Sequence, residues 1–181
     1  MTCMSSAPVP FNEHRRLALL RELCILDTPP DQAFDLVTRL ASQAFNVPMA
    51  VVSLLDKDRQ WFKSKVGVEL SETPRDQAFC AYAILQPEVT VVLDAREDPR
   101  FQVNPLVTGE PSIRFYAGAP LTSREGVNLG TLCVIDTQPR LAFGASEQAL
   151  LCTMAAMVAQ RLEVLRALDY MDQTLALPNR A

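Results

Sequence analysis

The residues of this chain best suited to covalent chemistry are five cysteines, Cys3, Cys24, Cys80, Cys133 and Cys152. Their number is odd and no Cys-x-x-Cys pair occurs, so the sequence indicates neither a disulfide framework nor a zinc knuckle. Unpaired cysteine usually packs as a small hydrophobic residue. We therefore expect buried free thiols. Whether the fold brings Cys80 and Cys133 together is left open by the sequence.

The single histidine limits the catalytic mechanisms that this chain could support. His14 lies beside Arg15 and Arg16 in a predicted helix, where neighbouring cations disfavour a charged imidazole. We expect it on the surface. Any Ser-His, Cys-His or multi-histidine metal site would have to include this one residue, so we predict no catalytic set and no metal site.

Composition indicates one soluble domain with an extension. The chain has 181 residues, is 49% hydrophobic and 21% charged, and carries a net charge of -4. The basic residues are scattered, which gives no electrostatic footprint for nucleic acid. No apolar run approaches the roughly 20 residues that span a bilayer, and the first residues lack the features of a signal peptide. We expect a cytoplasmic protein without nucleic-acid or membrane partners.

The elements that must position these residues are two helices, two strands, a helix, a strand, a long loop, two strands and a long helix. The helices are predicted at 13–25, 30–45, 77–84 and 146–172. The strands are predicted at 49–55, 60–65, 89–93, 113–121 and 129–136, and the long loop at 94–112. The two hairpins supply antiparallel neighbours, so we expect an α+β domain with a mostly antiparallel sheet and helices packed against it. Residues 1–11 are predicted to form a flexible tail.

The last predicted helix is longer than one small domain needs. At ~1.5 Å per residue it reaches about 40 Å. Its far end must therefore meet a partner or project into solvent.

Four blocks of sequence resemble the bacterial GAF domain family, in the family's order and spacing. They are Arg59–Lys63, Glu72–Ala81, Phe115–Leu121 and Leu129–Asp136. The resemblance covers residues 12–168 and implies a five- or six-stranded antiparallel sheet with helices on both faces. It further implies a homodimer through the terminal helices and a pocket between the sheet and the loop helices.

A second resemblance lies at the end of the chain. Asp172 and the run Leu177–Arg180 are in register with the opening of a GGDEF diguanylate cyclase domain, whereas Thr174, Leu175 and Ala176 depart from it. Residues 169–181 are therefore predicted to be a linker or the start of a GGDEF-like output domain.

The pocket that the family resemblance implies gives a set of candidate ligand-binding residues. They are Trp61, Phe79, Cys80, Asp94, Phe101, Asn104, Arg114 and Tyr116. Aromatic side chains would supply an apolar wall, and the few polar groups would orient an unidentified small molecule. The loop 94–112 is expected to provide specificity, because ordered loops of this length are usually functional.

Known cofactors of the family fit this sequence poorly. Bilin attachment to Cys80 is disfavoured because Ala81 and Tyr82 follow it, where chromophore-binding relatives place a histidine. Haem binding is disfavoured because the sequence offers no histidine near the pocket as an axial ligand. Cyclic nucleotide binding is disfavoured because the sequence has no Gly-rich phosphate loop.

Our leading hypothesis is a non-catalytic sensory or regulatory domain that biases an output domain through its last helix, in cyclic di-GMP signalling. The alternative is an enzyme. It would be either part of a diguanylate cyclase whose catalytic domain follows residue 181, or a thiol-dependent reductase that uses Cys80. A pure dimerisation module with a filled pocket is the third possibility.

Overall fold

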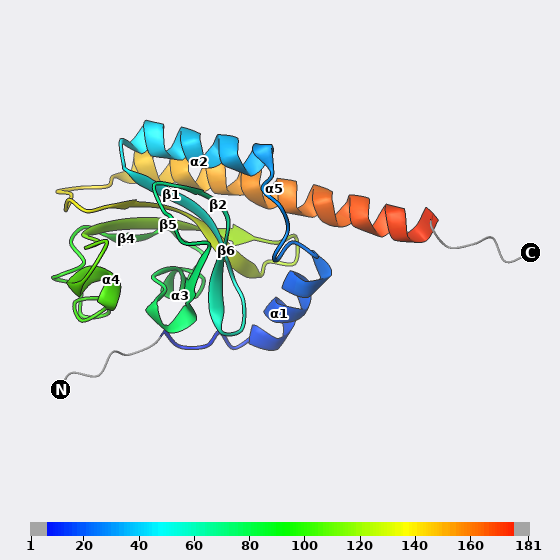
Figure 1. Ribbon diagram of the computed structural model, residues 1–181, viewed down its shortest axis with the longest axis horizontal. Helices are drawn as coiled ribbons and strands as arrows, with labels where there is room; N and C mark the ends of the chain where they lie inside the picture. The colour runs from blue at the N-terminus through cyan, green and yellow to red at the C-terminus, as the bar shows by residue number, and fades with distance from the viewer. Residues whose placement is uncertain (1–6, 176–181) are drawn as a thin grey trace, which may run out of the picture.

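The computed structural model describes residues 7–175, and Figure 1 shows a single sheet with helices on both sides. The sheet has six strands in the spatial order β3-β2-β1-β6-β5-β4, and every neighbouring pair is antiparallel. The strands are β1 Met49–Leu55, β2 Arg59–Val66, β3 Glu72–Pro74, β4 Thr90–Val92, β5 Phe115–Thr122 and β6 Asn128–Asp136. The predicted α+β fold is confirmed.

Five α-helices complete the described chain, and a short 3-10 helix spans Arg75–Gln77. The helices are α1 Glu13–Glu22, α2 Gln32–Phe45, α3 Cys80–Ala83, α4 Pro105–Thr108 and α5 Ala145–Leu175. Helices α2 and α5 cover one face of the sheet, whereas α3 and α4 lie on the opposite side (Figure 1). Asp31 fixes the start of α2, since its carboxylate accepts a hydrogen bond from the Ala33 N–H at 2.9 Å.

The two faces of the sheet carry two separate hydrophobic cores. One core joins α1, α2 and α5 to strand residues such as Ala117 and Leu132. The other joins α3 and the segment after β4 to residues such as Tyr116 and Cys133. Side chains alternate along a strand, so residues next to each other in sequence point into different cores. Because both cores are apolar, β1 is buried along its whole length.

Four local features differ from the predicted elements, and one of them is helix α4, which lies inside the predicted loop 94–112. The first helix ends at Glu22 rather than 25, and Cys24 beyond it has the left-handed φ of 48°. Residues 77–84 hold only the end of a 3-10 helix and the single turn α3. The short edge strand β3 was not predicted. It ends at Pro74, a residue that sheets accept at their edges.

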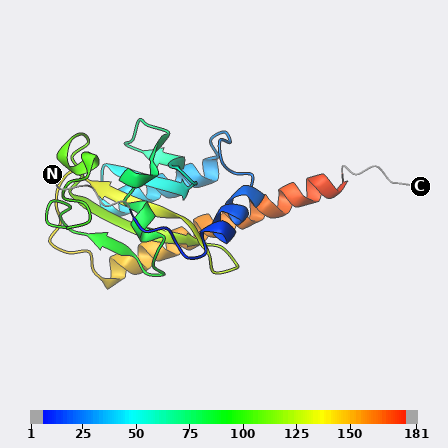
Figure 2. The ribbon, with the colours of Figure 1, turned by 90° about the horizontal axis from the view of Figure 1, so that it is seen from below.

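Helix α5 extends well beyond the rest of the molecule. Its 31 residues correspond to about 46 Å at 1.5 Å per residue. Figure 2 shows it passing α1 and leaving the sheet behind, which confirms that the long helix projects. Within the described part of the chain, no helix has the length and apolarity needed to cross a membrane.

Candidate functional site

A cavity of about 480 Å³ lies on the α3 side of the sheet. Ligand pockets commonly measure ~300–1,000 Å³, so this one has room for a small molecule. Its apolar lining comes from strands, from the turn after β2 and from the segment around α4. That lining includes Met49, Val51, Phe62, Val68, Leu106 and Ile113.

Gln60 is the polar group of the cavity with an open hydrogen-bonding position. Its side chain lines the cavity and the residue is only 7% exposed. The Nε2 atom donates to Thr73 Oγ1 at 3.3 Å, whereas Oε1 has no hydrogen-bond partner among the described residues. A buried acceptor without a partner is costly. A ligand that donates a hydrogen bond would remove this cost.

The charged residues that line the cavity are both acidic. Glu69 follows β2 and Glu110 follows α4, and both are exposed. Among residues 7–175, no Lys, Arg or His lines this cavity. Its field therefore disfavours anionic occupants and suits neutral or cationic ones.

At the floor of the cavity, polar groups converge on the sulfur of Cys80. Tyr116 Oη donates to it at 3.3 Å and Thr131 Oγ1 at 3.0 Å, while Cys133 Sγ lies 3.8 Å away. Burial by itself would raise the pKa of Cys80, but hydrogen bonds from Cys133, Ser53, Thr131 and Tyr116 outweigh it and lower this pKa to about 6. The pKa of Cys133 is raised, first by its hydrogen bond with Cys80 and second by burial.

Aromatic packing fixes the side chains around this sulfur. Phe79 stacks on Phe101 with ring centroids 4.0 Å apart, and it contacts the Tyr116 ring at 5.2 Å. Gly118 leaves room for the Tyr116 hydroxyl, since a Cβ at that position would lie 2.1 Å from Oη. The predicted residues Phe79, Cys80 and Tyr116 thus meet at the cavity. Phe101 packs behind them without lining it.

The other predicted site residues lie away from this cavity. Trp61 points into the core on the α2 side, because it alternates with Gln60 and Phe62 along β2. Asp94 pairs with Arg96 at 2.6 Å near the surface.

Two of the predicted polar residues instead hold the loop in shape. Asn104 caps α4 by accepting from the Leu106 N–H, and its amide donates to the Gln77 carbonyl. Arg114 donates to the carbonyls of Val107 and Ile113.

The prediction that all cysteines are buried is wrong for two of them. Cys80 and Cys133 are buried, whereas Cys24 and Cys152 are exposed. Cys24 lies after the end of α1, in the turn that leads to α2, and Cys152 lies on the outer side of α5. Among the described residues no group of His, Cys, Asp and Glu is arranged to hold a metal ion.

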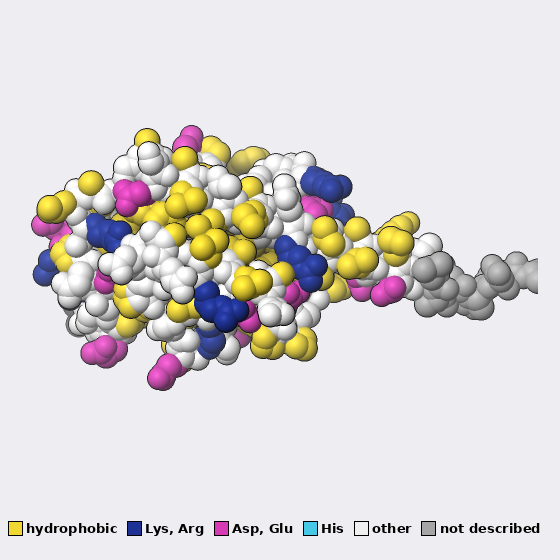
Figure 3. All heavy atoms as spheres, turned by 90° about the horizontal axis from the view of Figure 1, so that it is seen from above, with side chains coloured by type: hydrophobic (Ala, Val, Ile, Leu, Met, Phe, Trp, Pro, Cys, Tyr) yellow, Lys and Arg dark blue, Asp and Glu magenta, His cyan; other side chains and the backbone are white. Residues whose placement is uncertain are grey.

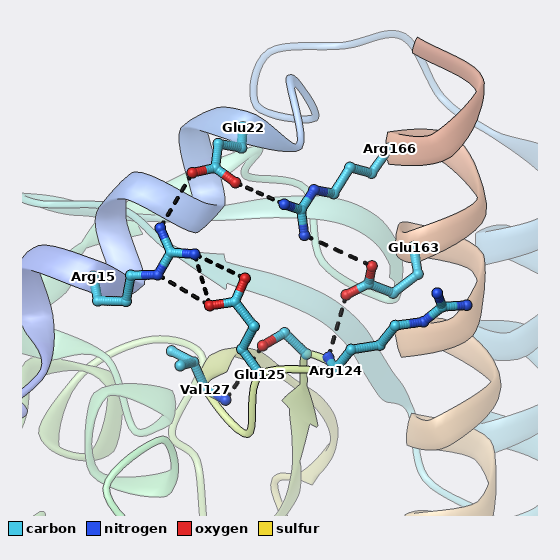
Figure 4. A network of polar contacts seen from close by, with 8 residues as sticks. Arg15, Glu22, Arg124, Glu125, Val127, Glu163 and Arg166 are labelled. Carbon is cyan, nitrogen blue, oxygen red and sulfur yellow. Dashed lines mark hydrogen bonds and ion pairs between the residues drawn. The ribbon is translucent and has the colours of Figure 1, made fainter. Parts of the chain in front are cut away.

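A polar network joins α5 to the rest of the domain near the point where the helix leaves it (Figure 4). Glu22 on α1 accepts from Arg15 at 3.3 Å and from Arg166 on α5 at 2.8 Å. Arg15 also pairs with Glu125 of the β5–β6 turn at 2.7 Å. In the same turn the Arg124 N–H donates to Glu163 of α5 at 3.3 Å.

The antiparallel sheet, with long helices on one face and a lined cavity on the other, defines the class as a small α+β domain built around a pocket. The sequence pattern of the GAF domain matches residues 29–162. The chain therefore belongs to the GAF domain family.

One relative is similar over nearly the whole chain. The cyclic di-GMP phosphodiesterase of Pseudomonas aeruginosa is 45% identical over 177 residues, which cover 98% of this chain. The chain spans only 30% of that protein.

Solved structures share the fold at low identity. The GAF domain of a phosphoenolpyruvate-protein phosphotransferase from Coxiella burnetii has a TM-score of 0.65 at 18% identity, over 87% of this chain and 98% of that one. The free methionine-R-sulfoxide reductase of Neisseria meningitidis, solved with its substrate, has a TM-score of 0.62 at 17% identity. The match covers 92% of this chain and 99% of that one.

Proposed function

We propose that this domain is a non-catalytic sensor that binds a small molecule in the cavity and passes a conformational bias through α5 to an output domain. The observation that carries this proposal is the cavity itself, which combines an apolar lining with the unpaired, buried Oε1 of Gln60. A filled pocket, as in a pure dimerisation module, would leave neither the space nor the open acceptor.

The lining supports a proposal for the chemistry of the ligand. The proposed ligand has an apolar body that packs on residues such as Phe62 and Ile113, and it donates a hydrogen bond to Gln60. It is neutral or cationic, because Glu69 and Glu110 are the charged groups that line the site.

The output that we propose is cyclic di-GMP turnover. The relative with 45% identity is named as a cyclic di-GMP phosphodiesterase, and it is about three times as long as this chain, which supports a parent protein with a further domain. The GGDEF-like opening stays a prediction. Residues 172–175 belong to α5, and residues 176–181 lie outside the described part of the chain. We place the domain in the cytoplasm, since free thiols are typical of a reducing compartment.

Transmission rests on the polar network around Glu22 and Arg166. It holds α5 to α1 and to the β5–β6 turn, and β6 also carries Cys133 at the cavity floor. A ligand that shifts β6 would change which of these exposed ion pairs form, and so the angle at which α5 leaves the domain.

We propose a second copy of this chain as the partner of the outer face of α2 and α5. Figure 3 shows hydrophobic side chains gathered on this side of the molecule. On α5 four exposed apolar residues recur every seven positions, at Leu150, Met157, Val164 and Met171. This seam supplies one of the two apolar positions that coiled coils repeat every seven residues, and the exposed Leu168 widens it near the far end of the helix. The seam continues onto the projecting half of the helix, where this domain has nothing to cover it.

The cavity is tested by native mass spectrometry of the domain purified from the organism that makes it. We expect wild-type protein to retain a small molecule, and Val68→Trp, at the cavity wall, to lose it. Leu141→Trp, at a fully exposed position of the β6–α5 loop, is the matched control and should retain it. Wild-type protein at its bare sequence mass, or an adduct that survives Val68→Trp, would contradict the proposal.

A further inference from the structure

We propose that Cys80 and Cys133 form an oxidisable dithiol, which a small hydroperoxide entering the cavity converts into a disulfide. The two sulfurs lie 3.8 Å apart and belong to different elements, α3 and β6. Both residues line the cavity, although they are only 2% and 1% exposed. The pair is therefore open to a small molecule in the cavity and shielded from large oxidants in solution.

The surroundings of the two thiols differ in a way that assigns them different roles. Cys80 Sγ accepts from the hydroxyls of Tyr116 and Thr131 and lies next to the Cys133 thiol, all of which stabilise a thiolate. The pKa of Cys133 is raised by its hydrogen bond with Cys80 and by burial, so it keeps its proton longer than Cys80 does. The thiolate is the nucleophilic form of cysteine, so Cys80 reacts first and Cys133 second.

The reaction takes two steps. The Cys80 thiolate attacks the terminal oxygen of the hydroperoxide, the O–O bond breaks, and an alkoxide leaves and takes a proton from water. Cys80 is then a sulfenic acid. The sulfur of Cys133 attacks the sulfenic sulfur, the S–O bond breaks, and the departing hydroxide takes the Cys133 proton to leave as water. The two sulfurs lose two electrons in total, and the peroxide gains them.

Closing the disulfide changes the cavity floor. The sulfurs must approach from 3.8 Å to about 2 Å, which draws α3 toward β6. Tyr116 and Thr131 at the same time lose the charged acceptor that orients their hydroxyls. Oxidation would thus reshape the site at its floor.

The test uses hydrogen peroxide on the chain with Cys3, Cys24 and Cys152 replaced by serine, which leaves only the pair. We expect the intact mass to fall by two hydrogens and a Cys80–Cys133 peptide to appear without reductant. In that background Cys133→Ser should stop at a sulfenic acid that dimedone traps, and Cys80→Ser should not react. Tyr116→Phe keeps the ring and should slow the first step about tenfold, because one hydrogen bond to the thiolate is lost.

Two results would overturn the assignment. One is a pair that stays reduced until the protein is unfolded by denaturant, which would mean that peroxide does not reach the sulfurs. The other is oxidation of Cys133 at the wild-type rate in Cys80→Ser, which would reverse the roles. Circular dichroism of each variant before treatment separates these results from misfolding.

Discussion

Replacing Gln60 by methionine should stabilise the ligand-free domain, although it removes a hydrogen bond. Gln60 is paired across the sheet with Leu55 on one side and Thr73 on the other, and its Oε1 is buried without a partner. Leaving such an acceptor unpaired costs about 1–3 kcal/mol, while the 3.3 Å bond from Nε2 to Thr73 contributes about 1 kcal/mol at most. Methionine has a similar length and no polar hydrogen.

The net gain expected for Gln60→Met is about 1 kcal/mol, measured by urea unfolding of ligand-free protein. For a domain of this size that is roughly 2–4 °C in Tm. Gln102→Met, at an exposed turn position, is the control and should change stability by less than about 0.5 kcal/mol. Destabilisation of the domain by about 1 kcal/mol or more in Gln60→Met would show instead that the amide oxygen is satisfied in the free protein.

Three further outcomes follow from named contacts. Hydrogen bonds from Arg16 and Arg75 outweigh the burial of Glu13 and lower its pKa from 4.5 to about 2, so its contribution to stability is complete above about pH 4.5 and disappears as the pH falls toward 2. Glu13→Gln should lower the free energy of unfolding by about 3 kcal/mol at pH 7, because Arg16 is left buried without its carboxylate. In the variant, the free energy of unfolding should depend less on pH between about 4.5 and 2 than it does in the wild type. Arg166→Ala should change Tm little, since exposed ion pairs contribute about 0.5 kcal/mol, yet speed hydrogen exchange in the α5 segment after Glu163. Val164→Glu should yield monomers by light scattering, whereas Gln138→Glu on a loop should not.

The order of the elements could be predicted because the strands and long helices carry strong periodic patterns. Residues 49–55 form a strand at those bounds, since a short β-branched apolar run leaves few alternatives. β3 was missed because three residues that end in a proline carry no pattern of their own. Helix α4 was missed although Asn104-Pro105 is a usual helix start, since its single turn is too short to show periodicity.

The candidate site could be predicted only in part. Phe79, Cys80 and Tyr116 were found because they lie within the family blocks. Trp61 also lies in a family block and is aromatic, but it falls on the face of β2 that points away from the cavity. The same alternation would have shown that Gln60 shares the cavity face with Phe62. Glu69 reaches the cavity through a turn whose path is set by tertiary packing, and the sequence gives no local signal for it.

A crystal structure of the domain purified from the organism that makes it tests the central claim most directly. We expect electron density for a small molecule in the cavity, with a donor atom within hydrogen-bonding distance of Gln60 Oε1 and no acidic group beside Glu69 or Glu110. A cavity closed by its own side chains, or one whose density belongs to an anion held away from Gln60, would contradict it.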